Sequence, residues 1–358
     1  MRLMLTGSGA TALAVLTERD PWAAAERPQA AASRSPGRAI VRTLLKDVPR
    51  DALGNGAILL HEHLSLGGPK PPEEAHRILE LVRKAGREGV GCIVDVGMTD
   101  LGRDVDSLKQ IASQTNVHIV AGGGYSPAHA DLTKLHPDIL TKSEDQMADD
   151  LVRDASAARQ GVFGEIGTGS VSGDVAKAGG PITDLERKVF RAIGKAHLRT
   201  GLPIITHTAY HRIPDAPKNF GLEQLDAFES VGVNPQHVVI GHMCCTNDPE
   251  AGQAKAIARR GAFVAFDRVT GVPLPDEARV RMVQAMLAAG LGHNLVLGSD
   301  FIATRRNLAT PPPEGPGPER TVTVFVPLLR KAGIAEAAIR DLTVNNPRRA
   351  LQFVPKSG

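Results

Sequence analysis

The stretch AILLHEH at residues 57–63 begins as an apolar run and closes on two histidines. An amphipathic segment at 73–88, with apolar residues at helical spacing, leads from it to a second apolar run, GCIVDVG at 91–97. Strand, helix and strand in this order form the unit from which parallel sheets are built. This stretch therefore predicts an α/β fold with a parallel sheet.

The same alternation continues along the chain. Further apolar runs rich in β-branched residues lie at 117–122, 161–166, 203–208, 237–242, 262–267 and 295–300. Amphipathic segments separate them, at 104–113, 143–159, 183–200, 222–231, 249–260 and 276–289. Eight such units predict a closed (β/α)8 barrel, a TIM barrel, and continuous apolar runs are typical of parallel strands covered on both faces. An open doubly wound sheet is the alternative, but the Gly-rich phosphate loop it usually carries after its first strand is missing.

The two ends of the chain differ from this pattern. A Pro/Gly-rich loop at 310–319 precedes expected short helices at 320–332, 335–342 and 346–353, which close the barrel domain at 46–358. Residues 1–45 are predicted to be an N-terminal extension, either an export signal or disordered, because one Arg precedes a small, apolar stretch and an Ala-rich segment. Two locations, cytoplasmic and periplasmic, stay open.

Composition excludes some classes of function. The net charge is only +3, and the Lys and Arg residues are scattered, whereas binding to the phosphate backbone of nucleic acid needs clustered cations. Aromatic residues make up 3% of the chain, too few for a platform that stacks bases. No run reaches the ~18 apolar residues that a membrane span needs. We therefore expect neither a nucleic-acid partner nor a membrane span.

Six side chains of metal-binding types close the predicted strands. They are His61, His63, Glu165, His207, His242 and Asp300. Alternation along a strand puts His61 and His63 on one side, and in barrel enzymes the reactive side chains gather at the C-terminal ends of the strands. A single His at a strand end is more often a surface or core residue. Six such residues on one rim instead predict a metal site, because imidazole and carboxylate suit zinc and its neighbours.

The number of ligands indicates two metal ions. A single catalytic zinc takes three protein ligands and keeps one position for water, so six ligands are too many. We assign them as His61, His63 and Asp300 on the first ion, His207 and His242 on the second, with Glu165 shared. A hydroxide between two such ions is a nucleophile at neutral pH, and a metal also polarises the bond under attack.

At this point the chain resembles the phosphotriesterase family of the amidohydrolase superfamily. The matching stretches, in family order between residues 55 and 353, are LLHEHL, VDVG-x4-GRD, NVHIVAGGGY, FGEIGT, RTGLPIITHT, VVIGHMCCTND, LVLGSDF, TVFVPLLRKAGI and NNPRRALQF. The paired His motif and the later His, His and Asp are shared across the superfamily, whereas FGEIGT and the VFVPLLRKAG tail are specific to this family. The resemblance implies a barrel with a binuclear, usually zinc, hydrolytic site, and it favours a homodimer.

Two departures from the family pattern bear on the chemistry. Where the best-known members bridge their metals with a carbamylated lysine, this chain has Glu165, as in the phosphotriesterase-homology branch. Positions of a proton relay in some members correspond to Cys245 and Arg268, so Asp300 is the expected catalytic base. Arg268 resembles an Arg of the lactonase branch or pairs with a nearby acid such as Asp267, and Tyr125 either donates to a substrate oxygen or packs. Both are candidate catalytic residues.

The sequence thus predicts a metal-dependent hydrolase acting on a small-molecule lactone, carboxyl ester or phosphoester. Glu165 and Arg268 favour the carboxyl side of this range over efficient phosphotriester hydrolysis. Two alternatives remain: a single-metal deaminase of the same superfamily, and a non-catalytic metal-containing binding protein. The segment after His207, TAYHRIPD, lacks the Glu that such deaminases carry there.

Overall fold

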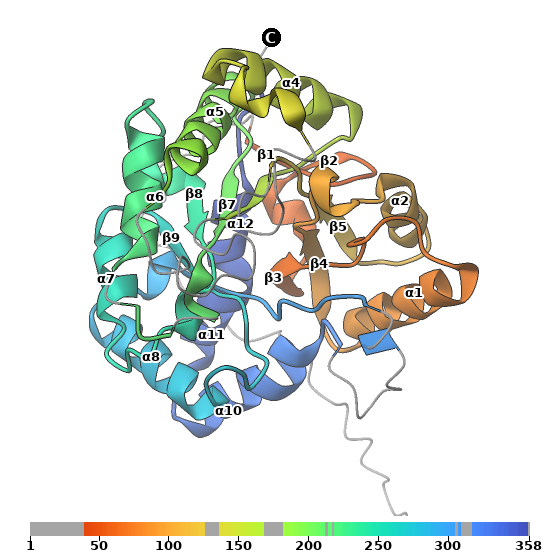
Figure 1. Ribbon diagram of the computed structural model, residues 1–358. Coiled ribbons are helices and arrows are strands. Elements are labelled where there is room, and N and C mark those ends of the chain that lie inside the picture. Colours follow the sequence, from red (N-terminus) through yellow and green to blue (C-terminus); the bar gives the residue numbers. More distant parts are fainter. Residues whose placement is uncertain are drawn as a thin grey trace, which may run out of the picture.

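The computed structural model describes residues 39–125, 136–167, 182–211, 214–216, 218–304, 307–308 and 317–356. The export-like segment of the N-terminus and residues 310–316 of the predicted Pro/Gly-rich loop lie outside these ranges. Strands occupy the centre of the molecule and helices surround them, with α1 and α2 on one side and α4 to α8 around the other (Figure 1).

The strands form two parallel arcs. One arc contains β3 (Ala57–Glu62), β4 (Val90–Asp95) and β5 (His118–Ala121). The other contains β6 (Phe163–Gly167), β7 (Ile204–His207), β8 (Val238–Ile240), β9 (Phe263–Phe266) and β10 (Leu295–Leu297). Each of the eight predicted strands is present.

Hydrogen bonds beyond the strand ends join the two arcs at both seams. At one seam His63 bridges Ile302 in parallel, and the Asp300 amide donates to the His61 carbonyl at 2.9 Å. At the other seam Gly123 bridges Gly164, and the Gly164 amide donates to the Gly123 carbonyl at 2.9 Å. The predicted (β/α)8 barrel is confirmed, and four of the candidate ligands lie at or beside these seams.

The helices follow the strands as the sequence predicts, within a few residues. Their bounds are α1 (Pro72–Arg87), α2 (Val105–Ser113), α4 (Glu144–Ala157), α5 (Asp184–Thr200), α6 (Phe220–Glu229), α7 (Gly252–Arg259) and α8 (Asp276–Ala288). Capping boxes start two of them, Ser143 with Gln146 at α4 and Thr183 with Glu186 at α5. Gly201 ends α5 in the left-handed region at φ 80°, a conformation that glycine adopts without strain.

Shorter helical segments complete the chain. After the eighth strand come π-helical turns and α-helices at Thr321–Phe325, α10 (Val326–Lys331), α11 (Glu336–Arg340), Asp341–Asn345 and α12 (Asn346–Leu351). Three-residue and four-residue 3-10 helices lie at Arg50–Leu53, Thr99–Leu101, Pro137–Leu140, Ala209–His211, Pro235–His237, Met243–Cys245 and Gly292–Asn294. In the part of the chain that is described, no helix combines the length and apolar character of a membrane span.

A small hairpin covers the bottom of the barrel. Strands β1 (Ile40–Arg42) and β2 (Asp47–Pro49) pair antiparallel, and Ile40 also bridges Phe353 near the C-terminus. The predicted division between residues 45 and 46 falls within this hairpin. The hairpin ties the start of the described chain to its end.

The barrel interior is packed. Ile58 and Leu60 of β3, Val94 of β4, Ile205 of β7 and Val296 of β10 are all 1% exposed or less and form one cluster. Two further clusters fill the space between the strands and the surrounding helices. A filled barrel holds its strand ends rigidly, and the site is built on those ends.

Candidate metal centre

All six candidate ligands lie at the C-terminal ends of the strands and are buried. His61 is in β3 with His63 just after it, Glu165 is in β6, and His207 closes β7. His242 and Asp300 follow β8 and β10 by two and three residues. Their exposed fractions run from 0% for His61 to 6% for Asp300. The parallel barrel therefore brings residues 61 and 300 onto one rim, as the sequence predicts.

The first ligand group consists of His61, His63 and Asp300. One ligand atom from each lies within 4.8 Å of the others. His63 Nε2 is 3.3 Å from Asp300 Oδ1, and His61 Nε2 is 3.9 Å from the same oxygen. These three residues are the set that we assigned to the first metal ion.

A second group shares His61 with the first. His61, Glu165 and His242 also have ligand atoms within 4.8 Å of one another. His61 Nε2 is 2.9 Å and His242 Nε2 is 3.7 Å from Glu165 Oε2, while His63 Nε2 is 3.4 Å from Glu165 Oε1. The two oxygens of Glu165 thus face histidines of both groups, as a shared ligand requires.

His207 lies beside this second group. Its ring is 4.6 Å from that of His242, centroid to centroid, in an edge-on arrangement, and the residue is 1% exposed. Gln224 of α6 donates to the His207 carbonyl at 2.8 Å, which fixes the end of β7. His207 thus approaches the centre from the His242 side, but it belongs to neither ligand group, and its assignment to the second ion stays a prediction.

Asp267, which directly follows β9, is a residue of the site whose role the sequence analysis missed. It is 0% exposed, and its two oxygens lie 2.8 Å from His61 Nδ1 and 3.0 Å from His242 Nδ1. The His242 backbone amide also donates to it at 2.8 Å. A carboxylate at Nδ1 fixes the tautomer of a histidine and leaves Nε2 for a metal. Asp267 contacts two histidines in this way, and both of them face Glu165 Oε2.

Charges within this cluster perturb the titration of its members. Burial alone would lower the pKa of His61, but Glu165 and Asp267 raise it to about 10. Burial lowers the pKa of His63 to about 4 despite the attraction of Glu165. Burial would raise the pKa of Asp267, yet His242 and His61 hold it below its ordinary value. Asp267 is therefore an anion, ready to accept two N–H bonds.

Backbone geometry singles out two of the candidates. His242 and Asp300 have φ of 58° and 50°, in the left-handed region that side chains other than glycine rarely adopt. Such conformations persist only where the surrounding structure enforces them, and they cluster at functional sites. Beside Asp300, the buried Glu62 accepts the Ser299 and Phe301 amides at 2.7 and 2.8 Å. This clamp holds the turn that carries Asp300.

Arg268 reaches the centre through Asp300. Its guanidinium forms an ion pair with Asp300 Oδ2, and its side chain is 24% exposed. The acid that Arg268 pairs with is thus Asp300, whereas Asp267 bonds to the histidines. One carboxylate therefore links the histidine cluster to a partly exposed cation.

Tyr125 lies apart from this network. Its ring packs edge-on against His136, with centroids 4.9 Å apart, and the side chain is half-buried beside the larger core cluster. Burial raises the pKa of Tyr125 to about 12, so the hydroxyl stays protonated at neutral pH. Among the described residues, no contact joins it to the six candidate ligands.

These residues fit a divalent metal. Imidazole nitrogens and carboxylate oxygens converge from four strands, and two of the three histidines in the ligand groups have Nδ1 engaged by Asp267. Mixed nitrogen and oxygen ligands with ordered outer-shell partners are typical of zinc and related ions. The two groups that share His61 offer room for more than one ion.

Comparison with known proteins places this site in a family. The sequence profile of the phosphotriesterase family matches residues 50–351. The chain belongs to the phosphotriesterase family. It is thus a hydrolase-family member with a TIM barrel, and its candidate metal ligands lie on the rim where the family resemblance places them.

The sequences of individual relatives are consistent with membership of this family. The phosphotriesterase homology protein of Escherichia coli is 29% identical over 83% of this chain and 98% of its own length. An aryldialkylphosphatase of Saccharolobus solfataricus is 28% identical over 82% and 94%, and an N-acetyltaurine hydrolase of Salmo salar is 27% identical over 82% and 80%.

Solved structures give the same fold. The crystal structure of the Escherichia coli phosphotriesterase homology protein, complexed with phosphate in its active site, has a TM-score of 0.69 at 27% identity and covers 83% of this chain and 99% of its own. A resiniferatoxin-binding protein from Rhodobacter sphaeroides has a TM-score of 0.70 at 25% identity and covers 87% and 94%.

Proposed function

We propose that this phosphotriesterase-family protein is a hydrolase dependent on two divalent metal ions, most simply zinc, and that it cleaves an ester-type bond. The substrates we propose are a lactone, a carboxyl ester or a phosphoester. The observation that carries the proposal is the pair of ligand groups that share His61 and face the two oxygens of Glu165. The aryldialkylphosphatase among the relatives supports hydrolysis at an ester-type bond.

The chain's own residues have separate roles in this reaction. His61, His63 and Asp300 would hold one ion, His207 and His242 the other, with Glu165 shared. When bound, the ions supply a water that ionises at neutral pH and polarise the bond under attack. Asp267 orients two of the histidines throughout.

Asp300 is the proposed base. One of its oxygens faces His63 while the other accepts from Arg268. An ionised carboxylate in this place can orient the attacking water and accept its proton. The Arg268 side chain is partly exposed, so it can contact a substrate on the side away from Asp300. The Tyr125 hydroxyl remains a proposed donor to a substrate oxygen.

A second candidate reaction is hydrolysis of an N-acyl bond. Relatives named N-acetyltaurine hydrolase, from Salmo salar, Dictyostelium discoideum, Tetraodon nigroviridis and Danio rerio, are 26–28% identical to this chain. The aryldialkylphosphatase is 28% identical, so the relatives named for the two substrates have similar sequence identities to this chain. N-acetyltaurine therefore belongs among the substrates tested.

Counting metals in variants tests the proposed site. His207→Ala and His242→Ala should each remove about one metal equivalent, measured by elemental analysis of purified protein. His76→Ala is the matched control, because His76 is exposed on α1. Unchanged metal content in both site variants would refute the assignment. A metal content near one ion per chain in the wild type would instead favour the deaminase. Full loading with metal, with tight ligand binding but no hydrolysis, would favour a binding protein.

A further inference from the structure

Two adjoining cavities lie at the end of the barrel opposite the candidate metal centre. The first, about 250 Å³, lies between the β1–β2 turn and the start of β5, where His118 opens the strand. The second, about 700 Å³, extends to Arg83 and Arg87 of α1. Both are lined by residues 115–117. We call the combined space the basal groove.

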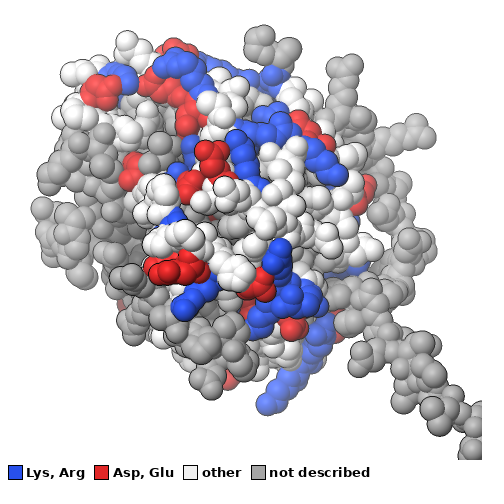
Figure 2. Space-filling model, turned by 90° about the vertical axis from the view of Figure 1, so that its right-hand side faces the viewer, with Lys and Arg blue, Asp and Glu red and all other residues white. Residues whose placement is uncertain are grey.

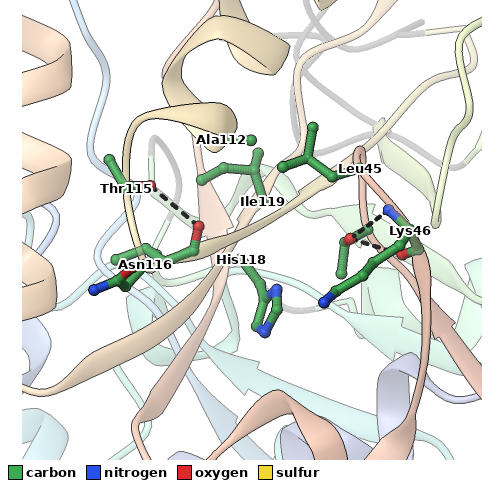
Figure 3. Close-up of a pocket in the computed structure, with 9 residues that line it drawn as sticks. Leu45, Lys46, Ala112, Thr115, Asn116, His118 and Ile119 are labelled. Atoms are coloured by element: carbon green, nitrogen blue, oxygen red, sulfur yellow. Dashed lines mark hydrogen bonds between the residues drawn. The ribbon is translucent and has the colours of Figure 1, made fainter.

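The described lining of the basal groove contains basic side chains and no acidic ones, although Arg83 pairs with Glu80 of the same helix at 2.7 Å. Lys46 and His118 line the first cavity and Arg83 and Arg87 the second, and no Asp or Glu is among the described residues that line either. The Lys46 and His118 side chains extend toward the same space (Figure 3). On the side of the molecule where α1 and α2 lie, Lys and Arg gather in groups with Asp and Glu between them (Figure 2).

No acidic side chain neutralises the first cavity. Within the described part of the chain, neither Lys46 Nζ nor the His118 ring has a hydrogen-bond or ion-pair partner. Asp47, the neighbouring acid, is bound by Arg42 at 3.2 Å and Arg159 at 2.7 Å. Burial, and then the charge of Lys46, lower the pKa of His118. The Lys46 cation thus shares this space with a His118 ring that can donate one N–H, and a bound anion would accept hydrogen bonds from both.

The remaining lining adds polar and apolar surface. Asn116 and Thr115 lie between the two cavities, and Leu45, 54% exposed, flanks the first with Ala112. Binding sites for organic ligands combine apolar walls with a few polar groups that fix orientation. The groove is therefore suited to an anion that carries an organic part.

We propose that the basal groove binds a small organic anion, with its phosphate or carboxylate group between Lys46 and His118 and its organic part along residues 115–117 toward Arg83. This site is separate from the metal centre, since His118 begins β5 whereas the candidate ligands lie at strand ends. The proposal does not depend on the reaction that the protein catalyses.

NMR of ¹³C-labelled histidines in the metal-loaded full chain tests this binding directly. The His118 signal is assigned by its loss in His118→Asn. Phenylphosphonate, which has no ester to hydrolyse, and benzoate are titrated separately at constant ionic strength. We expect at least one to shift the His118 signal saturably, and the one that acts at lower concentration identifies the anionic group.

Variants separate a specific site from general attraction. Lys46→Met should weaken the binding about tenfold, as expected when one charged hydrogen bond is lost. Lys331→Met is the matched control, because Lys331 is exposed on α10 and its loss changes the net charge equally. Failure of both anions to shift His118, an equal shift with chloride, or equal weakening by the two lysine variants would overturn the proposal.

Discussion

Replacing Asp267 by Asn tests how the structure prepares its histidines for metal. The carboxylate is fully buried, pairs with His61 Nδ1 at 2.8 Å and accepts from His242 Nδ1 at 3.0 Å. An Asn keeps the volume but has one acceptor oxygen, so its amide group would face the N–H of one histidine. That histidine must then turn away or change tautomer. A change of tautomer moves the proton to the nitrogen that is needed for the metal.

The expected loss follows from the two bonds affected. Removing an outer-shell partner typically costs 10-fold to 100-fold in metal affinity, and because Asp267 serves two ligands we expect about 100-fold, or ~2.8 kcal/mol. Competition with a chromogenic zinc chelator measures the affinity, and circular dichroism checks the fold.

A matched variant controls for the replacement of a buried carboxylate by an amide. Asp276 is also buried, 7% exposed, but it binds Arg279 at 3.2 Å and Arg320 at 2.6 Å instead of histidines. Asp276→Asn should leave zinc affinity within about twofold of wild type. If Asp267→Asn binds zinc as tightly as wild type, or if both variants weaken it equally, the orienting role is wrong.

Three further variants probe the base, the core and the response to acid. Arg268→Met removes the ion pair with Asp300 and should lower kcat/KM roughly 10-fold to 100-fold at unchanged metal content; an unaltered rate would contradict the pairing. Phe228→Ala removes a fully buried ring and should cost about 3–5 kcal/mol in urea unfolding, and a loss below ~1 kcal/mol would contradict close packing there. Burial lowers the pKa of His197 from 6.5 to about 4, so its folded form favours the neutral ring and its contribution to stability is lost as pH falls from 6.5 toward 4. In His197→Asn the free energy of unfolding should depend less on pH in that window. An unchanged pH dependence would exclude His197 as its cause.

The barrel could be predicted because its signals are local. Each strand is a short apolar run and each helix an amphipathic segment with its own caps, so Thr183 and Gly201 mark the ends of α5 before any tertiary contact is known. The β1–β2 hairpin was not foreseen. Its bridge from Ile40 to Phe353 joins residues more than 300 positions apart, and no local pattern encodes such a contact.

The convergence of candidate ligands was predictable for a topological reason. Parallel strands in a barrel carry their C-terminal ends to one rim, so residues that close successive runs meet there. The run AFVAFD closes on Asp267 in the same way, and this signal could have found it. Its role depends on which atoms of His61 and His242 it faces, which spacing does not determine. Likewise, only the folded geometry shows that Arg268 pairs with Asp300 and not with Asp267.

The most direct test of the proposed hydrolase is the initial rate of the metal-loaded protein on an aryl ester, an acyl lactone and an aryl dialkyl phosphate, each with and without a chelator. N-acetyltaurine is assayed alongside them. The two ligand groups that share His61, and the pairing of Asp300 with Arg268, predict hydrolysis that the chelator abolishes, fastest on the ester or lactone. Hydrolysis that persists in chelator, or no hydrolysis of any of these compounds at full metal loading, would contradict the account.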